Sequence, residues 1–145
     1  MEKRLELSAR LALLADWVPQ GARLADVGTD HGLLPIWLRL RGRISSAVAS
    51  DLRPGPLSRA RENAAAYGAD GIDFRLCDGL AAVGPGECDT VTIAGMGGEN
   101  TAAILAAAPW TADGRHTLLL QPQSRGETLR AFLADHGYAI RREAL

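Results

Sequence analysis

Short apolar segments alternate along this chain with segments whose apolar residues recur at helical spacing. The apolar segments predict strands over residues 22–28, 44–50, 71–77, 89–95, 115–121 and 138–145. The helical spacing predicts helices over residues 33–42, 55–68, 99–109 and 124–137. Strands and helices in this alternation form right-handed crossovers and a mostly parallel sheet covered on both faces. The sequence therefore predicts an α/β, doubly wound fold.

A further helix is predicted ahead of the first strand, over residues 8–18. Ser8 is a residue type that caps helix N-termini with its side-chain oxygen, and Pro19 cannot continue the helix. We interpret this segment as an amphipathic helix at the entry to the fold. The residues on its apolar face are Leu11, Leu14, Ala15 and Val18.

The length and composition predict one domain over residues 1–145, because 47% of the 145 residues are hydrophobic and can bury a sizeable core. Cys77 and Cys88 have neither the spacing of a zinc site nor the density of a disulfide scaffold. No apolar run approaches the ~20 residues of a membrane span, and no signal peptide is evident. We therefore expect a cytoplasmic protein without a membrane or metal partner.

The formal net charge of −1 gives the chain no overall attraction for a polyanion. Binding of a nucleic acid must then depend on local basic patches, although each arginine also fits a solvated helix face. Arg10 is a further candidate for a phosphate contact, and the sequence does not choose among these groups. The two clusters of arginines are Arg39, Arg41 and Arg43, and Arg53, Arg59 and Arg61.

Acidic residues dominate the loop after the first predicted strand, which contains Asp26, Gly28, Asp30, His31 and Gly32. Its glycine spacing is not that of a dinucleotide-binding G-x-G-x-x-G loop. Carboxylates at this place would repel a pyrophosphate and attract the ammonium and sulfonium of S-adenosylmethionine. We interpret the loop as a site for this cationic cofactor. The alternative is that Asp30 and His31 only cap the following helix.

Two further acids follow the second and third predicted strands. Asp51 comes 23 residues after Gly28, a spacing at which an acid reaches ribose hydroxyls in nucleotide-binding folds, with NAD as well as with S-adenosylmethionine. Asp78 is placed to accept a hydrogen bond from an adenine amino group. The adjacent Leu52 and Gly79, together with Gly95 after the fourth predicted strand, are the other candidate cofactor contacts. Three acids at successive strand ends point to one site, because such ends meet at the same edge of a parallel sheet.

The loops after the fourth and fifth predicted strands are candidates for contact with a substrate. Glycines after the fourth strand permit close backbone approach of a flat base, and a plain turn before the next helix is the alternative. Amides after the fifth strand can pair with the edge of a base. The candidates are Gly95, Met96, Gly97 and Gly98 in the first loop, and Gln121, Pro122 and Gln123 in the second.

Five segments of the chain together resemble the bacterial tRNA methyltransferases that modify N1 of adenine 22. The likeness spans nearly the whole chain, and the pairing of ADVGTDHG with IAGMGG is more specific than a generic methyltransferase pattern. The segments are LSARL, VPQGARLADVGTDHGLLPIWL, DGL, TIAGMGGE and LLLQPQ.

The resemblance implies a Rossmann-like class I methyltransferase fold, S-adenosylmethionine as the cofactor and tRNA as the partner. It implies that Asp26, Gly28, Asp30 and His31 form the first cofactor-binding motif. It also assigns Asp51 to the ribose and Asp78 to the adenine of the cofactor. Residues 95–98 correspond to the loop that faces the target base.

Members of this family continue past a sixth strand into a seventh strand and a helical C-terminal domain that helps to hold tRNA. Since this chain stops at Leu145, we interpret it as a catalytic domain truncated before the seventh strand. The sixth strand then lacks its antiparallel neighbour. We expect cofactor binding to survive and tRNA affinity to be weaker.

Methyl transfer to N1 of adenine uses a lone pair that the base already has, so positioning matters more than a strong base. The methylated product is positively charged, and Asp30 is the candidate to stabilise that charge. His31 is the candidate to orient Asp30 or to accept a proton. The target adenine must be unstacked, because N1 lies on its Watson–Crick edge.

Other functions remain as alternatives. A nicotinamide-dependent dehydrogenase would use the same sheet and Asp51, but it needs a phosphate-tolerant loop where this chain has an acidic one. A methyltransferase that acts on a small molecule fits the nearly neutral net charge. A cofactor-binding module that is inactive because it is truncated also fits the length of the chain.

Overall fold

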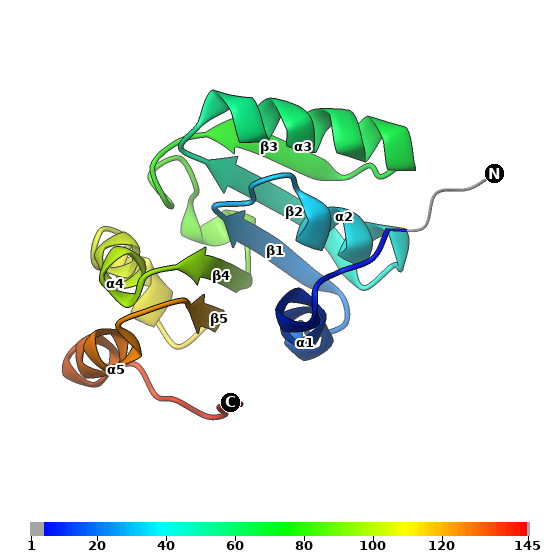
Figure 1. The fold of residues 1–145 in the computed structure, drawn as a ribbon. Helices are drawn as coiled ribbons and strands as arrows, with labels where there is room; N and C mark the ends of the chain where they lie inside the picture. Colours follow the sequence, from blue (N-terminus) through cyan, green and yellow to red (C-terminus); the bar gives the residue numbers. More distant parts are fainter. Residues whose placement is uncertain (1–4, 145) are drawn as a thin grey trace.

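The computed structural model describes residues 5–144, which form a five-stranded parallel sheet with helices on both faces (Figure 1). The strands lie in the order β3-β2-β1-β4-β5, so that the chain moves outward from β1 and then returns to the other side of it. This reversal confirms the predicted doubly wound α/β fold. The strands are β1 (Ala22–Val27), β2 (Ile44–Asp51), β3 (Ile72–Leu76), β4 (Thr90–Met96) and β5 (Thr117–Pro122).

The helices divide into two groups that cover opposite faces of the sheet (Figure 1). One face carries α1 (Ala9–Trp17), α2 (Leu33–Leu40) and α3 (Pro54–Tyr67). The other face carries α4 (Gly98–Ala106) and α5 (Gly126–Asp135). Within residues 5–144, no helix combines the length and the apolar character needed to cross a membrane.

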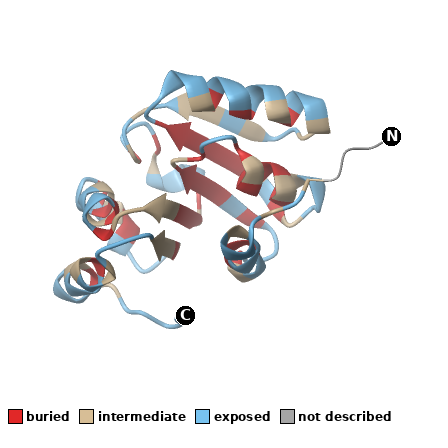
Figure 2. Cartoon of the chain, viewed as in Figure 1, coloured by how far each residue is buried: buried red, intermediate tan, exposed pale blue. Residues whose placement is uncertain are grey.

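The central strand β1 is buried on both sides, which explains its nearly continuous apolar sequence. Leu24 points into the core cluster beneath α1 and α2, whereas Ala25 and Val27 point into the cluster beneath α4 and α5. All three residues are at most 1% exposed. Figure 2 shows this buried centre, with exposed surfaces on the outer sides of the helices. The edge of the sheet where β1 ends is therefore held by core packing from both faces.

Most predicted elements are present with bounds shifted by a few residues. Helix α1 begins after Ser8, whose side-chain oxygen accepts a hydrogen bond from the backbone N–H of Leu11 at 3.4 Å. Two short 3-10 helices, Pro85–Glu87 and Pro109–Ala112, were not predicted. Each begins at a proline, whose fixed φ suits the first position of a helical turn.

The predicted strand over residues 138–145 is wrong for residues 138–144, and Leu145 lies outside the described residues. Tyr138 and Ile140 alternate as in a strand, but three charged residues follow, and Ile140 is 49% exposed. The segment is instead held by side-chain contacts. The Glu143 carboxylate lies 3.0 Å from the Arg130 guanidinium, and Arg142 stacks on the Trp17 ring at 4.2 Å. An apolar alternation of two residues buries too little to stabilise another strand at the edge of the sheet.

The loops after β4 and β5 are joined by backbone hydrogen bonds. The N–H of Gly98 donates to the carbonyl of Ser124 at 2.7 Å, and the N–H of Gln123 donates to that of Met96 at 2.8 Å. This contact is possible only because Gly98 lacks a side chain. A Cβ on Gly98 would lie 2.1 Å from the carbonyl oxygen of Arg125, which is a backbone atom.

We expect Gly98→Ala to lower the free energy of unfolding by at least about 2 kcal/mol, because the added methyl forces the two loops apart. Gly126→Ala is the matched control, since Gly126 also begins a helix but an added Cβ there meets nothing within 4 Å. Urea unfolding of both variants measures the difference. Equal stabilities would contradict the close packing of the two loops.

Candidate functional site

A cavity of about 710 Å³ opens at the carboxyl ends of β1, β2 and β4. Its walls come from the loops after these strands and after β3, from α1 and from one side of α4. In an open α/β sheet, ligands bind at this edge, where the order of the strands reverses. All the site residues predicted from the sequence line the cavity except Gly97, Gly98, Gln121 and Pro122.

The loop between β1 and α2 is shaped by three residues in the left-handed conformation. Gly28, Asp30 and Gly32 have φ angles of 66°, 56° and 74°. Residues other than glycine rarely adopt this backbone conformation. Asp30 is held in it by its backbone N–H, which donates to Asp51 Oδ2 at 2.9 Å. Strained residues of this kind gather at functional sites, because the surrounding structure must hold them in place. The loop therefore depends on a carboxylate from the neighbouring strand.

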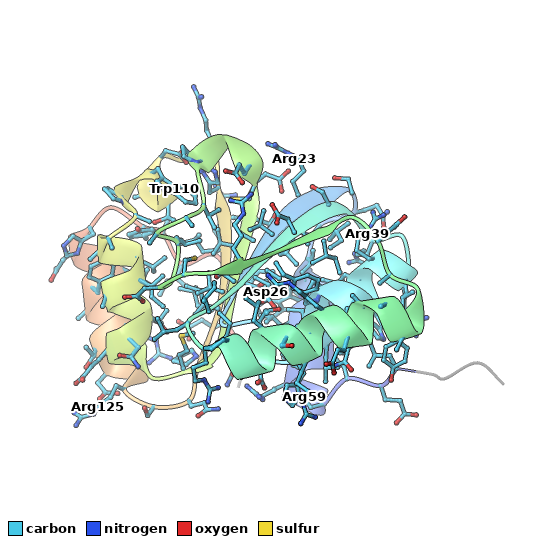
Figure 3. All side chains as sticks on the ribbon, turned by 90° about the horizontal axis from the view of Figure 1, so that it is seen from above. Arg23, Asp26, Arg39, Arg59, Trp110 and Arg125 are labelled. Atoms are coloured by element: carbon cyan, nitrogen blue, oxygen red, sulfur yellow. The ribbon has the colours of Figure 1, made fainter. Side chains whose placement is uncertain are left out.

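Asp26 is the most deeply buried acid of the cavity wall, with an exposure of 5%. Its Oδ1 accepts a hydrogen bond from the Thr92 hydroxyl at 2.7 Å, and its Oδ2 accepts one from the Thr29 hydroxyl at 2.8 Å. Burial raises the pKa of the Asp26 carboxyl to about 6, although the two hydroxyl donors oppose the rise. No basic side chain of residues 5–144 forms an ion pair with Asp26. A cation that enters the cavity would find an unpaired carboxylate there. Figure 3 shows Asp26 in the interior of the molecule.

Asp51, at the end of β2, organises two segments at once. Besides accepting from Asp30, it accepts a hydrogen bond from the backbone N–H of Arg53 at 2.9 Å through Oδ1. An ionised carboxylate has about four acceptor positions, so it can still accept hydroxyl groups of a ligand. The neighbouring Leu52 lines the cavity and is 66% exposed, which leaves its apolar side chain free to cover a ligand.

Asp78 and Gly79 follow β3 and line the cavity from the far side of β2. The carbonyl of Gly79 accepts the Ser50 hydroxyl at 3.0 Å, which ties this loop to the end of β2. Asp78 itself is exposed. Acids at the ends of β1 and β2 and just after β3 therefore line one cavity, as the strand order requires.

Asp30 and His31 stand at the exposed side of the cavity. Their side chains are 65% and 51% exposed, and His31 Nε2 lies 3.8 Å from Asp30 Oδ1. The alternative that they cap α2 is wrong, because Gly32 is the N-cap residue and no side chain caps this helix. Both side chains are thus available to a ligand.

The glycine-rich segment over residues 95–98, at the end of β4 and the start of α4, divides into two parts. Gly95 and Met96 line the cavity. The Met96 methyl carbon packs against Gly28, where an added Cβ would lie only 2.3 Å from it. Gly97 is the N-cap of α4, and Gly98 packs against the loop after β5. The structure therefore brings only the first half of the predicted glycine loop to the cavity, while Gly98 serves packing.

Gln121 joins three segments beside the cavity. Its Oε1 accepts hydrogen bonds from Arg10 Nη1 at 3.0 Å and from the backbone N–H of Gly95 at 3.1 Å. Arg10 and Gln123 line the cavity, whereas Gln121 and Pro122 do not. Gln121 thus holds Arg10 of α1 against the end of β4.

Several residues around the site were missed from the sequence. Thr92 lies directly opposite Asp26 in the pairing of β1 with β4, so aligning these strands would have suggested the contact. Asn100, Ala103 and Ile104 line the cavity from α4, and only the placement of that helix reveals them. Within residues 5–144, no group of three or more His, Cys, Asp or Glu side chains could hold a metal ion.

The sequence profile of the methyltransferase domain family matches residues 7–145, nearly the whole chain. The chain belongs to the methyltransferase domain family. A cavity lined by acids at the carboxyl edge of a doubly wound sheet is thus the candidate active site of a methyltransferase domain.

Individual relatives agree with this family. The tRNA (adenine(22)-N(1))-methyltransferase of Bacillus subtilis is 38% identical over 137 residues, which cover 94% of this chain and 58% of the relative. A crystal structure of a Streptococcus pneumoniae protein assigned as a tRNA (m1A22) methyltransferase matches with a TM-score of 0.90 and 43% identity, covering 96% of this chain and 64% of that one. A structure assigned likewise, in complex with S-adenosyl-L-methionine, matches with a TM-score of 0.85 and 44% identity over 91% of this chain and 63% of that one.

This methyltransferase domain therefore spans about three fifths of the length of these relatives. The family profile, which matches residues 7–145, contains the entire described sheet and every residue that lines the cavity.

The raised pKa of Asp26 predicts a pH dependence of stability. Because the pKa of about 6 in the folded state lies above the ordinary value of 3.8, the folded state binds the proton more tightly than the unfolded state. The resulting stabilisation is present at low pH and is lost as the pH rises through about 6. Relative to Asp26→Asn, we expect the wild-type chain to lose about 1 kcal/mol of unfolding free energy between pH 5 and pH 7.5.

Urea unfolding at several pH values measures this difference. The subtraction of the Asp26→Asn curve removes the contribution of the other carboxyl groups, which titrate in both proteins. Parallel curves for the two proteins would show that the Asp26 carboxyl is not desolvated.

Proposed function

We propose that this domain transfers a methyl group from S-adenosylmethionine to N1 of an adenine in tRNA, at position 22. The observation that carries the proposal is the set of acids, Asp26, Asp51 and Asp78, around one cavity of a methyltransferase domain. The substrate is taken from the tRNA (adenine(22)-N(1))-methyltransferase of Bacillus subtilis, with 38% identity over 94% of this chain. A tRNA substrate also favours a cytoplasmic location.

The residues of the cavity fit S-adenosylmethionine. Asp26 offers a buried carboxylate without a basic partner among residues 5–144, which suits the positive charge of the cofactor. Asp51 has acceptor positions left for ribose hydroxyls, and the exposed Leu52 can cover an adenine face. Asp78 is placed to accept from the adenine amino group, and Gly28 and Gly79 line the same cavity.

S-adenosylmethionine, when bound, supplies an electrophilic methyl group on a sulfonium. The protein's part is to hold the target adenine with its N1 lone pair directed at this methyl, since alignment supplies much of the catalysis. The side of the cavity formed by Gly95, Met96 and Gln123 is the proposed wall for the base. Arg10 lies beside this wall and is held there by a hydrogen bond to Gln121. Pro122 follows Gln121 in the chain.

Asp30 is the proposed electrostatic contributor. Methylation at N1 places a positive charge on the adenine ring, and a fixed carboxylate nearby stabilises the charge as it develops. The backbone of Asp30 is fixed by Asp51, while its side chain remains exposed beside His31. His31 can orient this carboxylate or accept a proton.

The first test is cofactor binding followed by methylation. We expect isothermal titration at pH 7.5 to show binding of S-adenosylmethionine but not of NAD, and Asp26→Asn to weaken that binding at least about tenfold. A tRNA transcript with adenine at position 22 should then gain N1-methyladenosine, detected by mass spectrometry of the digested RNA.

The control RNA carries guanine at position 22. Methylation of both transcripts, or of neither while the cofactor binds, would contradict the proposed substrate. Absence of cofactor binding in a folded chain would contradict the proposed activity itself.

A second prediction isolates the role of Asp30. We expect Asp30→Asn to keep its affinity for S-adenosylmethionine and to lower the single-turnover rate of methylation by about tenfold or more, because the carboxamide carries no charge. Asn also tolerates the left-handed backbone conformation of Asp30. A variant that retains the full rate would rule out the electrostatic role.

A further inference from the structure

The arginines of this chain differ in how their side chains are used. Arg39 donates to the Asp70 carboxylate at 2.8 Å and to the carbonyl groups of Ile44 and Ser45. Arg43 donates to the carbonyl groups of Val18 and Asp16. These guanidinium groups hold the amino end of β2, at the opposite edge of the sheet from the cavity.

Arg41 and Arg61 are also engaged. Arg41 stacks on the Trp37 ring at 4.3 Å, and Arg61 donates to the carbonyl of Phe74 at 3.3 Å. The sequence cluster around residues 39–43 is therefore mainly structural. It lies away from the cavity and does not offer a phosphate-binding surface near the candidate site.

Three other arginines near the cavity have side chains without such partners. For the part of the chain that the structure describes, no hydrogen bond or ion pair is formed by the guanidinium of Arg53, Arg59 or Arg125. All three residues are exposed. Their positive charges are thus available to a ligand.

Arg53 and Arg59 border the site on the α3 side. Arg53 lines the cavity, and Arg59 lines a shallow open cleft together with His31, Gly55 and Pro56. His31 lines both hollows, so the cleft lies next to the cavity. The Arg59 side chain is therefore at a hollow that borders the candidate site.

Arg125 borders the site on the side of the loop after β5. It follows Gln123, which lines the cavity, by two residues. Its backbone is in the left-handed conformation, with φ of 55°, and its carbonyl packs on Gly98. Figure 3 shows the labelled Arg59 and Arg125 along the same side of the molecule, with Arg23 on the opposite side.

We propose that Arg53 and Arg59 on one side and Arg125 on the other bind backbone phosphates that flank the target adenine of an RNA. The proposal rests on the function proposed above. The acids of the cavity suit a cationic cofactor, whereas the exposed arginines at its border, Arg53 among its lining residues and Arg59 in the cleft beside it, suit a ligand of opposite charge. An RNA strand whose target base enters the cavity must continue on both sides of it, and phosphates lie on both sides of every internal nucleotide.

The test measures binding of a fluorescently labelled tRNA transcript to the full 145-residue chain over a range of salt concentrations. We expect Arg59→Glu to weaken binding about tenfold at low salt. It should also reduce the magnitude of the negative slope of log K against log salt by roughly the amount that one phosphate contact contributes. Arg125→Asn should weaken binding by about threefold, since Asn removes the charge and still tolerates the left-handed conformation.

Arg115→Glu is the matched control. It makes the same change of charge on an exposed arginine just before β5, at the edge of the sheet away from the cavity. We expect it to change tRNA affinity by less than about twofold, because general electrostatic attraction is weak at this distance. All three variants should bind S-adenosylmethionine as the wild type does, which also reports correct folding.

The outcomes separate this inference from the proposed function. If the wild type binds and methylates tRNA but Arg59→Glu and Arg115→Glu lose equal affinity, the phosphate contacts are wrong and the function stands. If Arg59→Glu loses cofactor affinity as well, the residue acts through the cofactor site and the inference is overturned. If the wild type binds the cofactor but no tRNA at any salt concentration, both the inference and the proposed RNA substrate fail.

Discussion

The geometry of the site depends on the hydrogen bonds that the Asp51 carboxylate accepts. This carboxylate accepts the backbone N–H groups of Asp30 and Arg53, and so it connects the loop after β1 with the start of α3. Hydrogen bonds to a carboxylate are stronger than those between neutral groups, which suits a loop that must hold a side-chain residue in the left-handed conformation. The residue proposed to meet the ribose is thus also the one that shapes the first loop. Its two roles use different acceptor positions of the same group.

The acids of the site lie in different environments, and these differences suit different tasks. Asp26 is desolvated, which raises the pKa of its carboxyl to about 6. At neutral pH its negative charge is therefore destabilised by burial, and a cationic ligand nearby would stabilise it. Asp30 lines the same cavity, but its side chain is 65% exposed. The fold thus places a carboxylate with a large desolvation penalty where the cofactor is proposed to bind. It places a solvated carboxylate where the chemistry is proposed to occur.

The other side of the site depends on backbone contact between the loops after β4 and β5. Gly98 lets these loops approach closely enough to hydrogen-bond, and Gln121 adds a side-chain link from Gly95 to Arg10. Helix α1 precedes the sheet in the chain, and this link holds it next to the ends of β4 and β5. The cavity is consequently enclosed by segments from nearly the whole length of the sequence.

Local pattern alone determined much of this protein. Apolar runs and helical spacing located five strands and five helices, and the glycines and acids near the strand ends located the acidic part of the cavity wall. These features are readable because side-chain periodicity and strand-end position depend on neighbours along the chain. The same reasoning failed at residues 138–144, where the alternation of Tyr138 and Ile140 was not matched by burial.

Only the tertiary structure decided which residues share a contact across the sheet. It separated Gly95 and Met96, which face the cavity, from Gly98, which packs on a backbone carbonyl. It paired Asp26 with Thr92, and it showed which arginines beside the cavity or elsewhere have internal partners and which have none among residues 5–144. A sequence lists residue types in order, but burial, desolvation and the partners of a charge depend on residues distant in the chain. Those properties are fixed only when the strands and helices pack together.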